Sequence, residues 1–341
     1  MSRHRVTSFD IAHLVGVSQS TVSRALRGSP LVNPETTRRV LEAARQLNYT
    51  VDKHASSLRT QRSGTLALLL FEDTTEDASH INPFFLPLLG SITRACARRG
   101  QDLLISFQQL SDDWHADYAD SMKADGLILL GYGDYLAWRG KLDKLVAQGT
   151  RFVRWGAVLE DQPGTAIGCD NREGGRLAGM HLLAAGCRRI AFLGHASQHF
   201  PEFLQRFEGC DSVLREAGSA LDRTLQVDAD SSEEAGHAAA EALLQLGRPF
   251  DAVFAASDLI AIGAMRALIE HGRRVPQDVA VIGFDDIPAA RMATPALSTI
   301  AQDTVSAGER LVDTLLQAIA GEPVHDQHLP VSLVPRQSSR R

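Results

Sequence analysis

The stretch Ser18-Gln-Ser-Thr-Val-Ser-Arg-Ala-Leu-Arg27 decides the fold of the N-terminal part of this chain. Ser18 is a favourable helix N-cap, and Gly28 follows the stretch as a helix stop. Val22 and Leu26 lie one turn apart and are expected to bury one face of the helix, together with Ala12 and Val17. The opposite face carries the polar side chains of Gln19, Ser20, Ser23, Arg24 and Arg27.

A first helix precedes this stretch and a third follows it. Ser8 is expected to cap the first helix, which stops at Gly16, a residue that tolerates the positive φ of a tight turn. Asn33 and Pro34 open the third as cap and first helical residue. Its predicted apolar stripe is Val40, Leu41, Ala44 and Leu47. This layout is typical of a helix-turn-helix, whose second helix reaches base edges in the major groove. Spacing alone leaves a small helical bundle open as the alternative.

Charge is distributed unevenly along the chain. The whole chain carries a formal charge of −6, yet residues 1–63 hold ten basic and four acidic side chains. Those residues therefore carry +6, and the remaining residues carry −12. A basic module joined to an acidic one is expected when the basic module alone binds phosphates.

Length and composition indicate a soluble protein of two or three domains, with 341 residues, 44% of them apolar and 22% charged. The longest apolar runs, such as 66–71, have the length of a strand rather than of a membrane span. No apolar run follows Arg3 and Arg5, so no secretory signal is visible. We expect a cytoplasmic protein without metal or cofactor. The four cysteines form no C-x-x-C pair and are expected to be free thiols, namely Cys96, Cys169, Cys187 and Cys210.

From Thr65 onward, short apolar strands alternate with helix-length amphipathic segments. The predicted strands cover 66–71, 103–107, 126–130 and 152–155, then 189–193, 225–227, 252–255 and 279–283. Predicted helices such as 83–99, 172–185 and 258–271 end at a glycine. This alternation predicts an α/β body of parallel sheets flanked by helices, in two lobes. The chain is expected to cross between the lobes near 169–171 and 284–286, with a ligand cleft at the carboxyl ends of the strands.

The same alternation occurs in enzymes, but the usual catalytic motifs are missing. The sequence contains no G-x-G-x-x-G after a strand, no P-loop, no G-x-S-x-G and no H-E-x-x-H. His195 and His199 lie beyond a strand end without a paired nucleophile, which favours ordinary loop histidines over an acid or base. No catalytic residue is therefore predicted.

The amino-acid types in the N-terminal residues 1–50 are more specific than the spacing of their apolar positions. The stretches 6–12, 16–26 and 32–40, continued by Leu47-Asn-Tyr49, resemble the DNA-binding head of the lactose-repressor (LacI/GalR) family. The resemblance implies that Gln19, Ser20 and Arg24 read bases, which suits the bidentate pairing of arginine with guanine and of glutamine with adenine. It implies phosphate contacts for Thr21 and Ser23. Thr7 and Ser18 are predicted as further DNA contacts.

The segment after the head, His54–Arg59, resembles the family's hinge helix, which orders on the operator. Leu58 matches the leucine that is wedged into the minor groove, where an apolar side chain can kink a base step. Val51 and His54 depart from the proline and the aliphatic residue common in relatives. We expect a helix-turn-helix domain at 1–50, a hinge at 51–63 and a two-lobed sensing and dimerisation domain at 64–341.

The body resembles the periplasmic sugar-binding-protein fold that serves as the family's sensor. The matching stretches are 82–85, 125–128, 206–209, 257–263, 281–286 and 299–303. The resemblance implies a stacking pair, Phe84 and Phe85, with Asn82 close enough to hydrogen-bond the ligand. Arg206 matches an arginine that clamps ligand oxygens, since its planar fork can serve two at once. Asp285 matches a carboxylate that accepts hydroxyl protons. Further polar positions are Ser257, Asp258 and Gln302, with capping of a helix as the alternative for Asp258.

One strand departs from the family pattern. Near the end of 152–156, many relatives place an acid or a small polar residue at the cleft, whereas here Arg154 or Gly156 takes that place. Trp155 between them is a candidate for stacking on a sugar ring, with a core position as the alternative.

These resemblances imply a sequence-specific DNA-binding transcription regulator, a repressor, whose operator affinity is controlled by a small ligand, above all a carbohydrate. A homodimer on a pseudo-palindromic double-stranded operator follows from the head geometry. The tail 330–341 is polar without a leucine heptad, so a tetramer is not expected. Two alternatives are an exported sugar-binding protein, against which the missing signal argues, and a metabolic enzyme with an accessory head.

Overall fold

The computed structural model describes residues 6–26, 28–49, 62–71, 81–107, 113–131 and 133–340. The chain divides into two compact units, Met1–Ser63, called the head, and Gly64–Arg341, called the body. Within the described ranges, no helix is both long and apolar enough to cross a membrane.

The head is a bundle of three helices, α1 (Ser8–Val15), α2 (Gln19–Leu26) and α3 (Pro34–Gln46). Its small core includes Ile11, Val22 and Val40, all fully buried. Gly16 ends α1 in the left-handed conformation, with a φ of 72°, as the tight turn before α2 requires. The Asn33 side chain accepts hydrogen bonds from the backbone of Glu35 and Thr36, which confirms the predicted cap of α3.

Two details of the head differ from the expectation. Thr7, not Ser8, is the cap of α1, because the carboxylate of Asp10 accepts hydrogen bonds from both the backbone and the hydroxyl of Thr7. Leu41 is 40% exposed, whereas Ala43 is buried. The apolar stripe of α3 is therefore centred about one residue from the predicted register.

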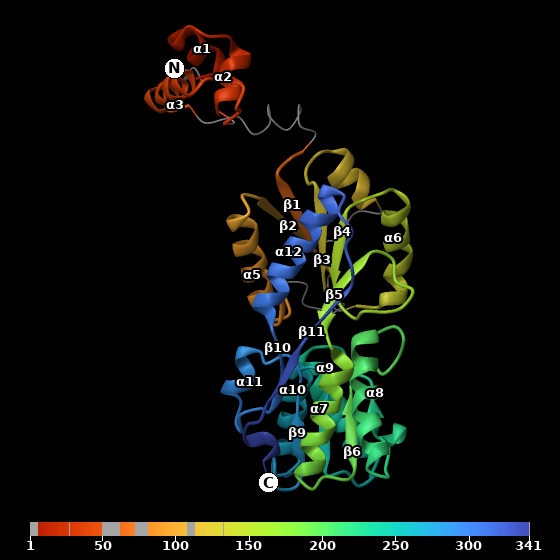
Figure 1. Cartoon of the computed structure of the whole chain (residues 1–341). Helices are drawn as coiled ribbons and strands as arrows, with labels where there is room; N and C mark the ends of the chain where they lie inside the picture. The colour runs from red at the N-terminus through yellow and green to blue at the C-terminus, as the bar shows by residue number, and fades with distance from the viewer. Residues whose placement is uncertain are drawn as a thin grey trace. The chain divides into compact units, whose positions relative to one another are not determined.

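The first lobe of the body is built on a six-stranded parallel sheet in the order β11-β5-β4-β3-β1-β2 (Figure 1). Its strands are β1 (Thr65–Leu70), β2 (Asp102–Phe107), β3 (Gly126–Leu130), β4 (Phe152–Trp155), β5 (Thr165–Cys169) and β11 (Gln327–Leu329). The helices of this lobe are α5 (Phe85–Arg98), α6 (Tyr135–Ala147), α12 (Thr304–Ala320) and the π-helical turn η1 (His115–Asp120).

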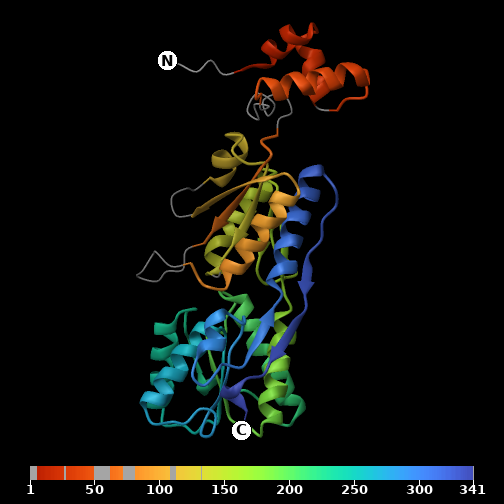
Figure 2. The same cartoon turned by 90° about the vertical axis from the view of Figure 1, so that its left-hand side faces the viewer.

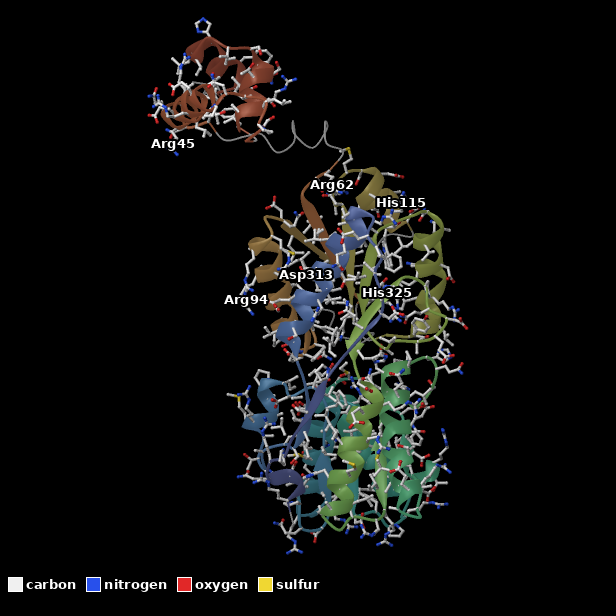
Figure 3. All side chains as sticks on the ribbon, viewed as in Figure 1. Arg45, Arg62, Arg94, His115, Asp313 and His325 are labelled. Atoms are coloured by element: carbon white, nitrogen blue, oxygen red, sulfur yellow. The ribbon has the colours of Figure 1, made fainter. Side chains whose placement is uncertain are left out.

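Both faces of the central strands β1, β3 and β4 are covered, which explains why these strands are almost entirely apolar. Along β1, Leu66, Leu68 and Leu70 join the core under α5 and α12, whereas Ala67 and Leu69 join a second core under α6. At the outer edge of the first core, Asp313 of α12 accepts a hydrogen bond from Arg99, with Nη2 and Oδ2 2.6 Å apart. Figure 3 labels Asp313 on α12.

The second lobe has a four-stranded parallel sheet in the order β7-β6-β8-β9. Its strands are β6 (Ile190–Leu193), β7 (Gln226–Val227), β8 (Ala252–Ala255) and β9 (Ala280–Ile282). Figures 1 and 2 show two helix pairs on its opposite faces, α7 (Asn171–Ala184) with α8 (Pro201–Glu216), and α9 (Glu233–Gln245) with α10 (Asp258–Glu270). The remaining elements are η2 (Arg223–Leu225), α11 (Pro288–Met292), β10 (Thr299–Gln302), β12 (Val331–Val334), which pairs antiparallel with β10, and η3 (Gln337–Ser339).

The lobes are joined by three passages of the chain rather than the two predicted. The crossing after β5 falls at residues 169–171, as expected. The one predicted at 284–286 is wrong, because Asp285 still bridges to Ala301 within the second lobe. The chain returns to the first lobe only between β10 and α12, and it crosses again between β11 and β12. The tail 330–341, expected only to be polar, thus contributes β12 to the second lobe, and β11 just before it joins the first lobe.

The α7–α8 contact depends on glycines that let the two backbones meet. A Cβ built on Gly175 of α7 would lie 2.0 Å from the carbonyl oxygen of Arg206, and one built on Gly209 of α8 would lie 2.0 Å from that of Arg172. No side-chain rotation can relieve a clash with backbone. The backbone of Arg206 is therefore held directly against α7.

We expect Gly175→Ala to destabilise the body by about 1–3 kcal/mol, since an added methyl group must push the two helices apart. The matched control is Gly140→Ala, because Gly140 lies in α6 with open space around its Cβ position. That substitution should be neutral or stabilising by up to about 1 kcal/mol through helix propensity. Urea unfolding, followed by the fluorescence of the three tryptophans, tests both, and equal midpoints would contradict the close-packing argument.

Candidate functional sites: a nucleic-acid interface and a pocket between the lobes

The start of α2 forms a polar surface of the head. Ser18, Ser20 and Arg24 are exposed, whereas Gln19, Thr21 and Ser23 are partly buried. The Ser18 hydroxyl lies 2.9 Å from that of Ser20 and 2.8 Å from that of Thr21. Because these side chains are short, the N-terminal end of α2 can approach base edges closely, as a helix that enters the major groove requires.

Two of the predicted DNA-contacting side chains also hold the head together. Gln19 Nε2 donates to the Ser8 hydroxyl across 3.2 Å, which ties α2 to α1, and Thr7 is engaged with Asp10. The side chain of Arg24 forms no hydrogen bond or ion pair with any residue in the described part of the chain. Arg39, by contrast, donates to the carbonyl of Val15 at the end of α1. The side chain of Arg39 therefore stabilises the head, whereas that of Arg24 is available to contact DNA. Leu58, His54 and Val51 lie outside the described residues.

Three of the predicted ligand residues meet in one buried cluster. Arg206 of α8 is fully buried, and its guanidinium donates to Asn171 Oδ1 at 2.9 Å and to the carbonyl of Ala256 at 2.5 Å. Its Nη1 lies 3.8 Å from Asp285 Oδ1. Gln302 Nε2 donates to the same carboxylate oxygen of Asp285 at 2.6 Å. The cluster joins α8 to the two segments that follow β9 and form β10.

The charge of Arg206 is stabilised mainly by aromatic and carbonyl groups. Its Cζ lies 3.7 Å from the ring centroid of Phe284 and 5.4 Å from that of Phe203. Burial raises the pKa of Asp285 to about 7, and the opposing effects of Arg206 and Gln302 only reduce that rise. Burial prevails because the carboxylate is enclosed and the ion pair with Arg206 is long, at 3.8 Å.

The raised pKa of Asp285 predicts a pH dependence of stability. Because the folded-state pKa lies above the ordinary value of 3.8, its contribution is fully present below about pH 4. It is lost as the pH rises through 7. Between pH 5 and pH 7 the free energy of unfolding should fall by about 2 kcal/mol more in the wild type than in Asp285→Asn. Urea titrations at both pH values test this, and parallel pH profiles would contradict it.

A second group of predicted ligand residues joins the two lobes. Asn82, which follows β1, donates through Nδ2 to Ser231 Oγ at 3.1 Å, and Ser231 donates to Ser257 Oγ at 2.8 Å. Ser257 caps α10 by accepting from the backbone of Ile260. Phe84 and Phe85 pack edge to face, buried in the core of the first lobe, and Phe84 lies 6.0 Å from Trp155 between ring centroids.

Asp258 serves the packing of the second lobe in this structure. Its two carboxylate oxygens accept from the backbone of Ile287 at 2.9 Å and from the hydroxyl of Thr299 at 2.6 Å. Burial, together with the neighbouring Asp285, raises the pKa of Asp258 well above its ordinary value. Both oxygens are thus occupied by groups of the protein. The loop histidines also have partners, since His195 bonds to Asp230 and His199 bonds across the lobes to Asp134.

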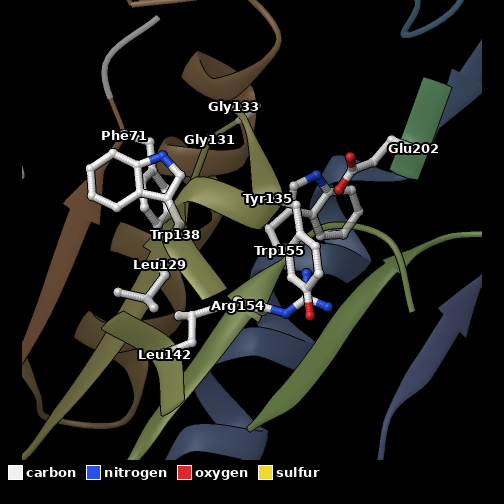
Figure 4. A pocket seen from close by; sticks show the side chains of 10 residues that line it. All are labelled: Phe71, Leu129, Gly131, Gly133, Tyr135, Trp138, Leu142, Arg154, Trp155 and Glu202. Carbon is white, nitrogen blue, oxygen red and sulfur yellow. The ribbon is translucent and has the colours of Figure 1, made fainter. Parts of the chain in front are cut away.

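A pocket opens at the carboxyl ends of the first-lobe strands, with about 430 Å³ of space that is partly open to solvent. Of the predicted ligand residues, only Trp155 lines it, beside Arg154 from the strand that departs from the family pattern (Figure 4). Glu202 at the start of α8 contributes the wall from the second lobe. The other lining residues are Phe71, Leu129, Gly131, Gly133, Tyr135, Trp138 and Leu142.

Sequence reasoning missed most of this pocket. Phe71, Gly131 and Trp155 stand where β1, β3 and β4 end, which is where parallel sheets bind ligands. That rule, applied to the last residue of every strand and the residue just after it, finds three of the ten lining residues. Tyr135 and Glu202 come from two helix starts on different lobes, and no sequence pattern relates them.

A helix-turn-helix head on a two-lobed binding-protein-like body defines a class of ligand-responsive DNA-binding proteins. Residues 9–52 match "Bacterial regulatory proteins, lacI family", and residues 180–339 match "Periplasmic binding protein-like domain". The HTH-type transcriptional regulator CelR of Thermobifida fusca is 32% identical over 97% of this chain and 96% of its own.

Solved structures of similar proteins match nearly the whole length of this chain. The lac repressor dimer bound to operator and the anti-inducer ONPF is 27% identical and has a TM-score of 0.81, over 99% of this chain and 100% of that one. A transcriptional regulator CelR–cellobiose complex is 31% identical and has a TM-score of 0.72, over 98% and 100% of the two chains. The chain belongs to the lacI family of bacterial regulatory proteins. It is a DNA-binding transcription regulator with a periplasmic-binding-protein-like sensor.

Proposed function

We propose that this protein is a cytoplasmic repressor that binds a pseudo-palindromic operator as a homodimer and releases or tightens on it when a sugar occupies the sensor. The observation that carries the proposal is the aromatic pocket between the lobes, whose walls come from both the first-lobe strands and α8. A ligand there touches both lobes at once. It would be bound and not converted.

The proposal gains support from the relatives and from the lobe connections. One similar structure is a complex with cellobiose, and another is bound to operator DNA. Three chain passages and the Asn82–Ser231 bond couple the lobes, so a ligand that prefers one lobe arrangement can shift the population of the other. The predicted ligand contacts of Arg206, Asp285 and Gln302 require that the lobes open to admit the ligand.

Operator binding should fall steeply with salt, because a basic head releases counterions from the phosphates it contacts. If a dimer contacts six to ten phosphates, raising salt from 50 to 200 mM should weaken binding by about 10³-fold or more. Fluorescence anisotropy with an operator selected from random DNA measures this. Removal of residues 1–63 should abolish the binding, and a flat salt response would contradict DNA binding through the head.

Effector binding is tested separately by thermal shift over a panel of mono- and disaccharides, since a ligand of the native state raises the melting temperature. A compound that binds must then change operator affinity, and the sign of that change distinguishes an inducer from a co-repressor. Recovery of the unchanged sugar after long incubation excludes turnover. A panel without a single binder would contradict the sugar effector.

A further inference from the structure

The pocket between the lobes holds a buried cation whose hydrogen-bonding capacity is only partly used. Arg154 on β4 is 6% exposed. Its Nη2 donates to the carbonyl of Ala157 at 2.8 Å and to Gln162 Oε1. Its Nε has no hydrogen-bond partner, and Nη1 donates to no residue in the described part of the chain. No carboxylate of the described residues comes within ion-pair distance of the guanidinium.

A second donor stands beside it. Tyr135, the first residue of α6, is 9% exposed, and its hydroxyl has no hydrogen-bond partner. Its ring centroid lies 5.3 Å from Arg154 Cζ, and its backbone N–H donates to the carbonyl of His199 on the second lobe. Figure 4 shows Tyr135 and Arg154 on the same side of the pocket as Trp155. Two buried polar groups without partners in one pocket cost free energy unless a ligand satisfies them.

Glu202 is the other charged group of the pocket, and it differs from Arg154 in its surroundings. It is partly exposed, and its Oε1 accepts from the backbone of Ala157 at 2.7 Å. A Cβ built on Gly156 would lie 2.9 Å from Arg154 Nη1 and 2.8 Å from Glu202 Oε1, so the two heads approach each other over Gly156 without pairing. Solvent screens the carboxylate of Glu202 more than it screens the buried guanidinium.

Resting on the proposed sugar effector, we infer that this effector is an anionic sugar, whose carboxylate or phosphate is bound by Arg154 and Tyr135. The guanidinium stays charged despite its burial, since arginine is not deprotonated in proteins. An anion satisfies it with charge-assisted hydrogen bonds, which are about twice as strong as those to a neutral hydroxyl. Trp155, Trp138 and Phe71 supply apolar faces for the ring. Glu202 disfavours a second negative charge, so the carboxylate should bind more tightly than the phosphate.

The test uses the full-length protein and calorimetric titration with matched sets, each holding a hexose or pentose, its uronate, its aldonate and its terminal phosphate. We expect an anionic member to bind at least tenfold more tightly than its neutral parent, and to change operator affinity. A neutral sugar that binds as well as its anionic partners overturns this inference and leaves the proposed function standing. A panel in which nothing binds overturns both.

Variants locate the anion. Arg154→Gln should weaken binding of the anionic sugar by about 10- to 100-fold, with partial recovery in Arg154→Lys. Arg151→Gln, an exposed position just before the same strand, is the matched control and should leave binding unchanged. Glu202→Gln keeps an acceptor for Ala157 but removes the negative charge, so it should tighten anion binding several-fold. If Glu202→Gln weakens binding instead, Glu202 binds the ligand directly and the inference fails, even where Arg154→Gln does not fold.

Discussion

Replacing Arg24 by alanine is expected to reduce strongly the discrimination between the operator and random DNA. Arg24 is exposed on α2, and its guanidinium forms no hydrogen bond or ion pair within the described part of the head that its removal would disturb. A bidentate arginine–guanine pair contributes about 1–3 kcal/mol of discrimination. Two half-sites in a dimer double that to about 2–6 kcal/mol, so the ratio of operator to random affinity should fall by about 30-fold or more.

Arg45→Ala is the matched control for Arg24→Ala, because it removes the same charge from an exposed position on α3, labelled in Figure 3. It should affect operator and random DNA to the same extent, since loss of a charge weakens phosphate attraction without regard to sequence. Anisotropy titrations of both variants on both DNAs give the two ratios. If Arg24→Ala keeps its discrimination and Arg45→Ala loses it, α2 is not the helix that reads bases.

Replacing Arg206 by methionine should destabilise the body by about 3–5 kcal/mol, although methionine fills much of the same volume. The substitution leaves the Ala256 carbonyl without the donor Arg206 Nη1, and it leaves Asn171 Oδ1 with only the weak donor of the Cys169 thiol. It also leaves Asp285 without a nearby cation. Urea unfolding followed by tryptophan fluorescence reports this directly, because Trp114, Trp138 and Trp155 all lie in the body.

The pH dependence separates the electrostatic part of that cost from the packing part. Asp285, with its pKa near 7, is neutral at pH 5 and ionised at pH 8, so the cost of Arg206→Met should grow between these values. The double variant Arg206→Met, Asp285→Asn should lose less than the sum of the single variants. Arg223→Met, an exposed arginine over the Phe207 ring, is the control and should stay within about 0.5 kcal/mol of the wild type. A pH-independent cost would show that packing alone accounts for it.

The local signals of the head were readable from the sequence because helix starts and stops depend on neighbouring residues. Gly16 and Asn33 act as predicted, since a left-handed turn and a side-chain cap involve only residues a few positions away. The prediction of Ser8 as the cap of α1 was wrong, because the cap depends on which hydroxyl reaches Asp10 once the turn has formed.

The body was predicted less completely where contacts join distant parts of the chain. Parallel strands with both faces buried are uniformly apolar, so β1, β3, β4 and β8 were clear from composition. The short strand β11 pairs with β5, which lies about 160 residues earlier in the chain, and β12 pairs with β10, about 30 residues earlier. A short edge strand with few apolar residues carries little local signal.

What the sequence by itself determined is the helix-turn-helix, the two-lobed α/β body and the family, because caps, glycine turns, strand composition and ordered motifs are local features. What only the tertiary structure decided is which side chains share a site. It brought Arg206, Asp285 and Gln302 into one buried cluster, and it gathered Arg154, Tyr135 and Glu202 around a pocket. The physical reason is that burial, and with it the strength of every charge and hydrogen bond, is a property of the packed lobes rather than of any stretch of chain.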